Sequence, residues 1–329
     1  MAEELAAEGS PEQPEELTVG ELIARSIGSA VAAMKEHEAG LRAGHDPDHV
    51  RKTRVAVRRL RSNLRTFQDF LEAEKTEPLV DELAVLAAEL GGVRDREVLA
   101  ARIRADARVL PGPDRKLVEE LIQVLEEEIR TARVSAIAYL DSERFTGLIA
   151  GLEAFSLVPP LTAAAAQPAR AIAGRLAAGP WEKLRKGVRG LPRNPADAQL
   201  HRIRILAKRA RYAAQAVEPV IPEAHAFAAA AAELQTILGD HQDAVTTEAW
   251  LAAAPTSGRQ AFVAGQLAGL ERAVAMEMRG RWREVWKALA APALRAWMDP
   301  DEQGRDQSTP EGSETTKTRR TRRTHEEGG

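Results

Sequence analysis

Two short segments of the chain carry many Lys and Arg residues and no acid. Residues 51–67 hold seven Lys and Arg, and residues 198–217 hold five together with His201. Such side chains bind phosphate through charge-assisted hydrogen bonds, and arginine can engage two oxygens at once. The formal charge of the whole chain is −3, and without these two segments it would be −15. This concentration of positive charge in an acidic chain favours binding of a polyanion.

Helical spacing places these cations in one narrow row on each segment. Residues three and four apart share a face of an α-helix, and each row runs beside an apolar stripe. Cations one turn apart would recur about every 5 Å, which suits a linear polyanion. The first basic row comprises Arg51, Arg54, Arg58, Arg61 and Arg65, and the second comprises His201, Arg204, Lys208 and Arg211.

A charged helix face is usually nothing more than a solvated surface. Here, however, no acid within either segment neutralises the row at helical spacing, so like charges repel one another. Each row also adjoins the apolar face rather than opposing it. A structural role alone explains this pattern poorly, and we expect the rows to form a functional basic groove.

The chain also contains an internal repeat. The segment VRKTRVAVRRLR (50–61) aligns with LHRIRILAKRAR (200–211), and LGGVRD (90–95) aligns with LGDHQD (238–243). The two motifs occur in the same order and at nearly the same separation. This predicts two related halves, about 18–160 and 165–299, within one helical domain at 18–299.

Composition favours an all-α fold. Alanine, leucine, glutamate and arginine dominate, and aromatic residues make up 4% of the chain. We expect helices separated by breaks, and disordered polar ends at 1–17 and 300–329, the second with a basic run at 317–323. The expected breaks are 111–113, 159–160, 179–180, 191–195, 219–222 and 255–258.

These motifs resemble those of the CHAD family, the conserved histidine α-helical domain, over most of residues 18–298. The resemblance implies two pseudo-symmetric four-helix bundles around a basic central groove or pore that binds inorganic polyphosphate, and association with polyphosphate granules. The family pattern has a histidine after the first residue of each motif. The second motif retains this histidine as His201, whereas the first motif has Arg51 at the same position. Arginine suffices for charge-driven binding but would not serve a mechanism that needs paired histidines.

The predicted site is therefore a polyphosphate-binding one built from both basic rows. Asp95 and Asp243 either orient nearby arginines or cap helices. Gly91 and Gly239 suit close packing or helix breaks better than a phosphate-binding loop. The secondary candidates are Lys52, Arg59, Arg94, Lys183, Arg185, Lys186, Arg202, Arg209 and Tyr212.

No catalytic residue set, metal site or cofactor is indicated, so the sequence predicts a non-enzymatic protein. The first alternative is a nucleic-acid binder. The scarcity of stacking aromatics disfavours single strands, and the scarcity of base-reading amides disfavours sequence-specific duplex binding, which leaves non-specific duplex binding through the basic run at 317–323. The second is a phosphohydrolase or phosphotransferase. The absence of a signal peptide and of a long apolar run predicts a cytoplasmic protein, granule-associated or free, without membrane contact.

Overall fold

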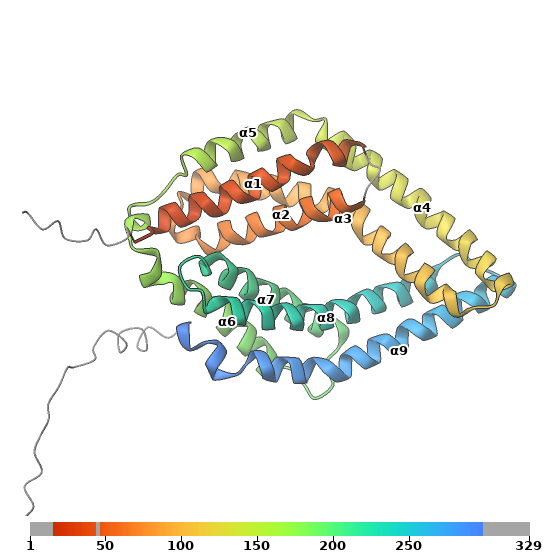
Figure 1. The fold of residues 1–329 in the computed structure, drawn as a ribbon. Helices are drawn as coiled ribbons and strands as arrows, with labels where there is room; N and C mark the ends of the chain where they lie inside the picture. The colour runs from red at the N-terminus through yellow and green to blue at the C-terminus, as the bar shows by residue number, and fades with distance from the viewer. Residues whose placement is uncertain (1–15, 44–46, 299–329) are drawn as a thin grey trace, which may run out of the picture.

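The computed structural model describes residues 16–43 and 47–298, and within them the chain forms nine α-helices (Figure 1). The only β-structure in these residues consists of two isolated bridges. The predicted all-α fold is confirmed. The helices are α1 (Val19–Ala43), α2 (Pro47–Thr66), α3 (Ala73–Asp106), α4 (Gly112–Leu140), α5 (Glu143–Leu157), α6 (Ala169–Arg189), α7 (Asp197–Val217), α8 (Ala224–Ala253) and α9 (Gly258–Leu289).

The helices form two groups, each around its own apolar core. α1 to α5 bury residues such as Ile23, Leu60 and Leu86, whereas α6 to α9 bury residues such as Leu200, Phe227 and Trp282. The repeat relates α2 to α7 and α3 to α8. The first group holds five helices rather than the expected four, because the chain turns between α4 and α5 and then returns along α1 and α3.

A third apolar core joins the two groups at their far ends. α3, α4, α8 and α9 have 29 to 34 residues, so they extend well beyond the 20- and 21-residue helices α2 and α7. The extensions leave the bundles and meet at the right of Figure 1. There Ile103 and Leu125 of the first group pack in one cluster with Leu251 and Leu267 of the second.

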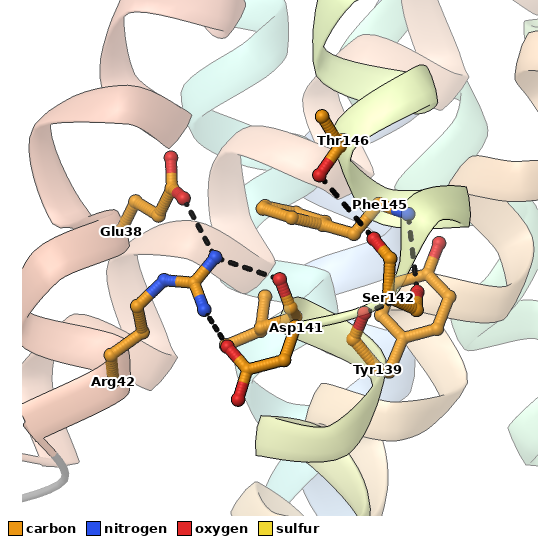
Figure 2. Close-up of polar contacts among 8 residues, drawn as sticks. Glu38, Arg42, Tyr139, Asp141, Ser142, Phe145 and Thr146 are labelled. Carbon is orange, nitrogen blue, oxygen red and sulfur yellow. Dashed lines mark hydrogen bonds and ion pairs between the residues drawn. The ribbon is translucent and has the colours of Figure 1, made fainter.

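The turn between α4 and α5 is held against the end of α1 (Figure 2). Arg42 donates to the carbonyl of Leu140 at 2.7 Å and to Glu38 at 3.0 Å, and it also forms an ion pair with Asp141. Ser142 caps α5, because its hydroxyl accepts a hydrogen bond from the Phe145 amide at 3.3 Å. These bonds explain why a new helix starts here although the sequence has no proline or glycine break.

The segment that links the two groups is fixed by backbone hydrogen bonds at two places. The amide of Val19 donates to Gln167 at 3.0 Å, and that of Ala169 donates to Leu17 at 2.8 Å. Further along, Glu72 donates to Pro160 at 2.9 Å. Leu17 is therefore ordered and partly buried, although the sequence placed it in a disordered end. The predictions for residues 1–15 and 300–329, including the basic run, lie outside the described residues.

One expected break is absent. Gly179 and Pro180 lie inside α6, which continues to Arg189. Proline within a helix loses one backbone hydrogen bond, but burial of Ala177, Trp181 and Leu184 on the same helix outweighs this loss. Of the helices between residues 16 and 298, none is both long and apolar enough to cross a membrane.

Candidate functional site

The two basic rows come together where α2 packs against α7 at the centre of the molecule. The apolar stripes beside the rows are buried as predicted: Val57, Leu60 and Leu64 in the first group, and Leu200, Ile203 and Ala207 in the second. Burial of each stripe in its own core fixes the rotation of its helix. The adjoining cations are thereby turned toward the boundary between the groups.

A pocket of about 620 Å³ lies between α2, α7 and the start of α3. Its cations are Arg58, Arg61 and Arg65 from α2, with Lys208 and Arg209 from α7. We call it the basic pocket. Its other lining residues are Ser62, Leu64, Gln68, Leu71, Ala73, Thr76, Glu77, Val80, Asp81, Ile205 and Tyr212.

Lys208 shows how little of this positive charge is compensated. Burial, together with the positive charges of Arg58, Arg204, Arg61 and Arg209, lowers its pKa from 10.5 to about 8. Two of these arginines belong to α2 and two to α7, so cations of both halves converge on one side chain. The pKa of Arg61 is also lowered, by burial and by Arg65. Such a cluster favours an anion that neutralises it.

One turn before the basic pocket, each row carries an arginine packed against a glycine of the neighbouring helix. Arg54 forms an ion pair with Asp95 at 3.1 Å, and a Cβ atom at Gly91 would lie 3.0 Å from its Nη1. In the second half, a Cβ atom at Gly239 would lie 3.5 Å from the Nε of Arg204. The glycines therefore serve close packing inside helices rather than helix breaks.

The two aspartates of the repeated motifs lie within α3 and α8, so neither caps a helix. Asp95 contacts Arg54 directly. Burial raises the pKa of Asp243, the positive charges of Arg204 and Arg102 oppose this, and the negative charges of Asp240 and Asp95 add to it. These interactions agree with the orienting role and place the carboxylates of both halves close to one another.

Arg51 at the start of the first row and both ends of the second row lie outside the described lining of the basic pocket. Asp48 accepts a hydrogen bond from Arg51 at 2.7 Å and forms an ion pair with Lys52 at 3.1 Å. Asp48 therefore neutralises the positive charge at the start of the first row. It lies one turn before the acid-free segment 51–67. In the second row, Arg211 donates to Gln235 at 3.2 Å and stacks over Tyr212. His201 is half-buried, and its Nδ1 has no hydrogen-bond partner among the described residues.

Most secondary candidates lie apart from the basic pocket. Arg94 pairs with Glu97 at 3.5 Å, and Arg185 pairs with Glu182 at 2.6 Å. Lys183 and Lys186 are exposed on α6, and Arg202 is exposed on α7. Arg59 lines a different pocket, between α1, α2 and α7, together with Arg25. Arg209 and Tyr212 are the secondary candidates that line the basic pocket itself.

Sequence reasoning missed the acidic wall of the basic pocket. Glu77 and Asp81 line it from the start of α3. Their separation of four residues shows that they share a helix face. This spacing does not show that the face packs over α2. The sequence also gave no sign of Arg102, which pairs with the buried Glu271 of α9 and lies near Asp243.

The described residues contain no group of three or more His, Cys, Asp or Glu side chains arranged to hold a metal ion. The described histidines are scattered. His37 and His49 make an edge-to-face contact at the end of the α1–α2 pair, and His241 is buried within 3.1 Å of Asp197. The charged and polar side chains that line the basic pocket offer electrostatic and hydrogen-bonding interactions.

Fold and pocket together define an all-helical protein with a cationic site between two groups of helices. A model of the CHAD domain matches residues 25–252, and the chain belongs to this family, as the motifs predicted. An uncharacterized Mycobacterium tuberculosis protein, found in two strains, is 30% identical over 270 residues. The match covers 76% of this chain and 49% of the relative, so the chain spans about half the length of the curated relatives it matches.

Two solved structures share the fold. PptA from Streptomyces chartreusis has a TM-score of 0.69 at 21% identity, covering 82% of this chain and 100% of that one. The CHAD domain from the plant Ricinus communis has a TM-score of 0.57 at 24% identity, covering 88% and 96%. At these identities the likeness establishes the arrangement of helices, and the ligand has to be argued from the residues of this chain.

Proposed function

We propose that the protein binds inorganic polyphosphate in the basic pocket as a non-catalytic binding protein of the cytoplasm, associated with polyphosphate granules. The observation that carries this proposal is the convergence of five cations from both halves on one pocket. Burial and four neighbouring arginines depress the pKa of Lys208, and an anionic ligand would relieve the mutual repulsion of these cations. Membership of the CHAD family supports polyphosphate over other polyanions.

The geometry suits a single linear chain of phosphates. Arg58, Arg61 and Arg65 follow one another at about one helical turn each, so phosphates along a strand would meet a cation repeatedly. Lys208 and Arg209 supply charge from the opposite helix. The volume of about 620 Å³ lies in the range of sites that enclose small ligands, so it admits a strand segment but not a duplex.

Nucleic acid fits the basic pocket less well. Proteins that hold single strands stack bases on accessible aromatic rings. Tyr212 is the one aromatic residue lining this pocket, and it is 6% exposed and covered by Arg211. A phosphohydrolase or phosphotransferase would in turn need a nucleophile or a base beside the phosphate. Ser62 and Thr76 line the pocket together with the carboxylates Glu77 and Asp81, and its described lining includes no histidine, so hydrolysis is tested directly.

The test is a binding titration with long-chain polyphosphate, duplex DNA and short phosphates at several salt concentrations. We expect polyphosphate to bind most tightly at matched charge, with affinity falling at least about tenfold from low to physiological salt as counterions are released. Arg58→Glu/Lys208→Glu should weaken binding by about a hundredfold, because each reversal removes a contact and adds a repulsion.

The matched control is Arg115→Glu/Lys287→Glu, which makes the same change of charge at exposed positions of α4 and α9. Its affinity should stay within about threefold of the unaltered protein. Tighter binding of DNA than of polyphosphate would overturn the proposed ligand. Shortening of polyphosphate by the purified protein, seen on a gel, would overturn the non-catalytic assignment.

A further inference from the structure

A second pocket lies on the other side of α2 from the basic pocket. It has a volume of about 490 Å³ between α1, α2 and the C-terminal end of α7, and we call it the outer pocket. On α2, Arg58 and Ser62 line the basic pocket, whereas Arg59 and Asn63 line the outer one. The two pockets share none of their described lining residues, so the outer pocket is a separate site.

Two arginines line the outer pocket and are available to a ligand. Arg25 belongs to α1 and Arg59 to α2, and both are exposed. Neither makes a hydrogen bond or an ion pair to another residue that the structure describes. A third arginine, Arg170, donates to the carbonyl of Val220 at 2.9 Å, beside the lining residue Pro219. Guanidinium groups from two separate helices can hold a phosphate group from two sides.

The carboxylates near these arginines have other partners. Glu218 lines the outer pocket, and its carboxylate lies 2.8 Å from the Nδ1 atom of His225. Glu21 lies one turn before Arg25 and accepts hydrogen bonds from the amide and the hydroxyl of Thr18, at 2.8 and 2.9 Å. Three arginines therefore lie around the outer pocket with two carboxylates, and this excess of positive charge favours an anionic ligand.

Two amide side chains add hydrogen-bonding groups to the outer pocket. Asn63 is 4% exposed, and its Nδ2 donates to the hydroxyl of Ser26. The Oε1 atom of Gln215 is buried and has no hydrogen-bond partner among the described residues. A buried acceptor without a partner destabilises a protein, and most such groups are paired with protein, ligand or water. Gln215 therefore indicates a bound molecule that supplies an O–H or N–H donor.

We propose that the outer pocket binds a small phosphate monoester that carries hydroxyl groups, such as a sugar phosphate. Its phosphate lies between Arg25 and Arg59, and one of its hydroxyls donates to Oε1 of Gln215. Interior phosphates of polyphosphate carry no hydrogen and cannot supply this donor. The described lining contains no aromatic residue on which a nucleotide base could stack, and the volume suits a small ligand. This proposal does not rest on the proposed function.

The test is a calorimetric titration of the full chain with glucose 6-phosphate. We expect saturable one-to-one binding, and glucose and inorganic phosphate should each bind at least about tenfold more weakly, because each offers only part of the contacts. A phosphate ester could also enter the basic pocket, so the titration is repeated with Arg58→Glu/Lys208→Glu. The affinity should stay within about threefold there, and its loss would assign the ester to the basic pocket and overturn the proposal.

Three variants test the contacts of the ester. Arg25→Ala/Arg59→Ala should weaken binding of glucose 6-phosphate by at least about tenfold. Its matched control, Arg108→Ala/Arg115→Ala, removes two exposed arginines around the turn between α3 and α4, and its affinity should stay within about twofold. Gln215→Leu should weaken binding about five- to tenfold, whereas its stability to urea without ligand should be kept or increased, because the unpartnered acceptor is gone.

The outcomes that contradict the proposal are distinct. If glucose 6-phosphate shows no saturable binding, or if inorganic phosphate binds as tightly as the ester, the proposed ligand class is wrong. An unchanged affinity in Arg25→Ala/Arg59→Ala would mean that the ester binds elsewhere. A Gln215→Leu protein that binds the ester as tightly as the unaltered protein would overturn the role of Gln215 as acceptor. Polyphosphate binding is measured separately and stands or falls independently of these results.

Discussion

Lys208 is the residue whose charge should depend most on the ligand. Its pKa is about 8 in the empty protein, and bound phosphates would raise it because they replace repulsion with attraction. Below pH 8 the ammonium is present before and after binding, so affinity is greatest there. As the pH rises above 8, binding requires uptake of a proton and affinity falls.

We expect calorimetric titrations at pH 8.5 to show proton uptake, seen as a binding enthalpy that changes with the ionisation enthalpy of the buffer. At pH 6.5 this dependence should be absent. Lys208→Arg keeps a permanent charge and serves as the control, so its binding should release or take up no proton at either pH. Proton uptake that persists in Lys208→Arg would assign the titration to another group.

Asp106 is a second titrating residue, at the junction of α3 with α9. Burial and the neighbouring Glu271 together raise its pKa from 3.8 to about 6, against the opposing charge of Arg102. Because the folded state holds this proton more tightly than the unfolded chain, stability due to Asp106 is greatest below pH 4 and is lost as the pH rises through 6. Asp106→Asn should therefore raise the free energy of unfolding at pH 7.5 by about 1–3 kcal/mol.

The measurement is urea unfolding at several pH values between 5 and 8, comparing Asp106→Asn with Asp69→Asn at an exposed position. The gain in Asp106→Asn should shrink toward pH 5, where the wild-type carboxyl already holds its proton. A gain that is equal at both ends of this range would show that Asp106 does not titrate there.

At the scale of the helix, glycines differ in what surrounds them. Gly174 of α6 is buried, and a Cβ atom there would lie 3.1 Å from the backbone oxygens of Trp297 and Met298. Gly265 of α9 has nothing within 4 Å of that position. Gly174→Ala should lower the free energy of unfolding by about 1–3 kcal/mol, because backbone must move. Gly265→Ala should raise it by about 0.5–1 kcal/mol through helix propensity.

Both variants are read by urea unfolding, with tryptophan fluorescence reporting on Trp297. A Gly174→Ala protein as stable as the wild type would show that the last turn is not packed against α6. The sequence does not tell these two glycines apart, because it does not show what packs against each of them.

The sequence predicts the helices that carry a periodic pattern, but it does not predict which helices pack against them. The spacing of Arg58, Arg61 and Arg65 reveals one face of α2 because helical geometry is local. Glu77 and Asp81 enter the same pocket only because α3 turns back over α2, which depends on distant packing. The Gly179-Pro180 pair signals a break locally, yet the packing around Trp181 keeps α6 continuous. Burial of apolar side chains, rather than helix propensity, therefore determines that α6 is continuous.

At the scale of the whole molecule, the far core holds the extended helices together without touching the basic pocket. Leu267 of α9 is fully buried there beside residues of α3 and α4. Leu267→Ala should lower the free energy of unfolding by about 2–5 kcal/mol. Polyphosphate affinity at low temperature should be unchanged, because none of the described residues that line the pocket belongs to the far core. Leu270→Ala, at a 39% exposed position, should change stability by less than about 0.5 kcal/mol.

Unfolding and binding are measured on the same preparations. A loss of affinity in folded Leu267→Ala would mean that the far core also sets the spacing of the two basic rows. The sequence does not predict this core, because such a prediction requires the lengths of four helices at once. The repeat, in contrast, is visible from the paired motifs.

The backbone hydrogen bonds around Val19 and Ala169 have a consequence for the way a ligand is selected. They tie the two groups together at one end, and the far core ties them at the other, so we expect the width of the basic pocket to be set before any ligand arrives. A rigid, preformed slot gives up little conformational entropy on association. We therefore expect the basic pocket to discriminate by ligand diameter, admitting a bare phosphate strand and rejecting a bulkier strand of equal charge.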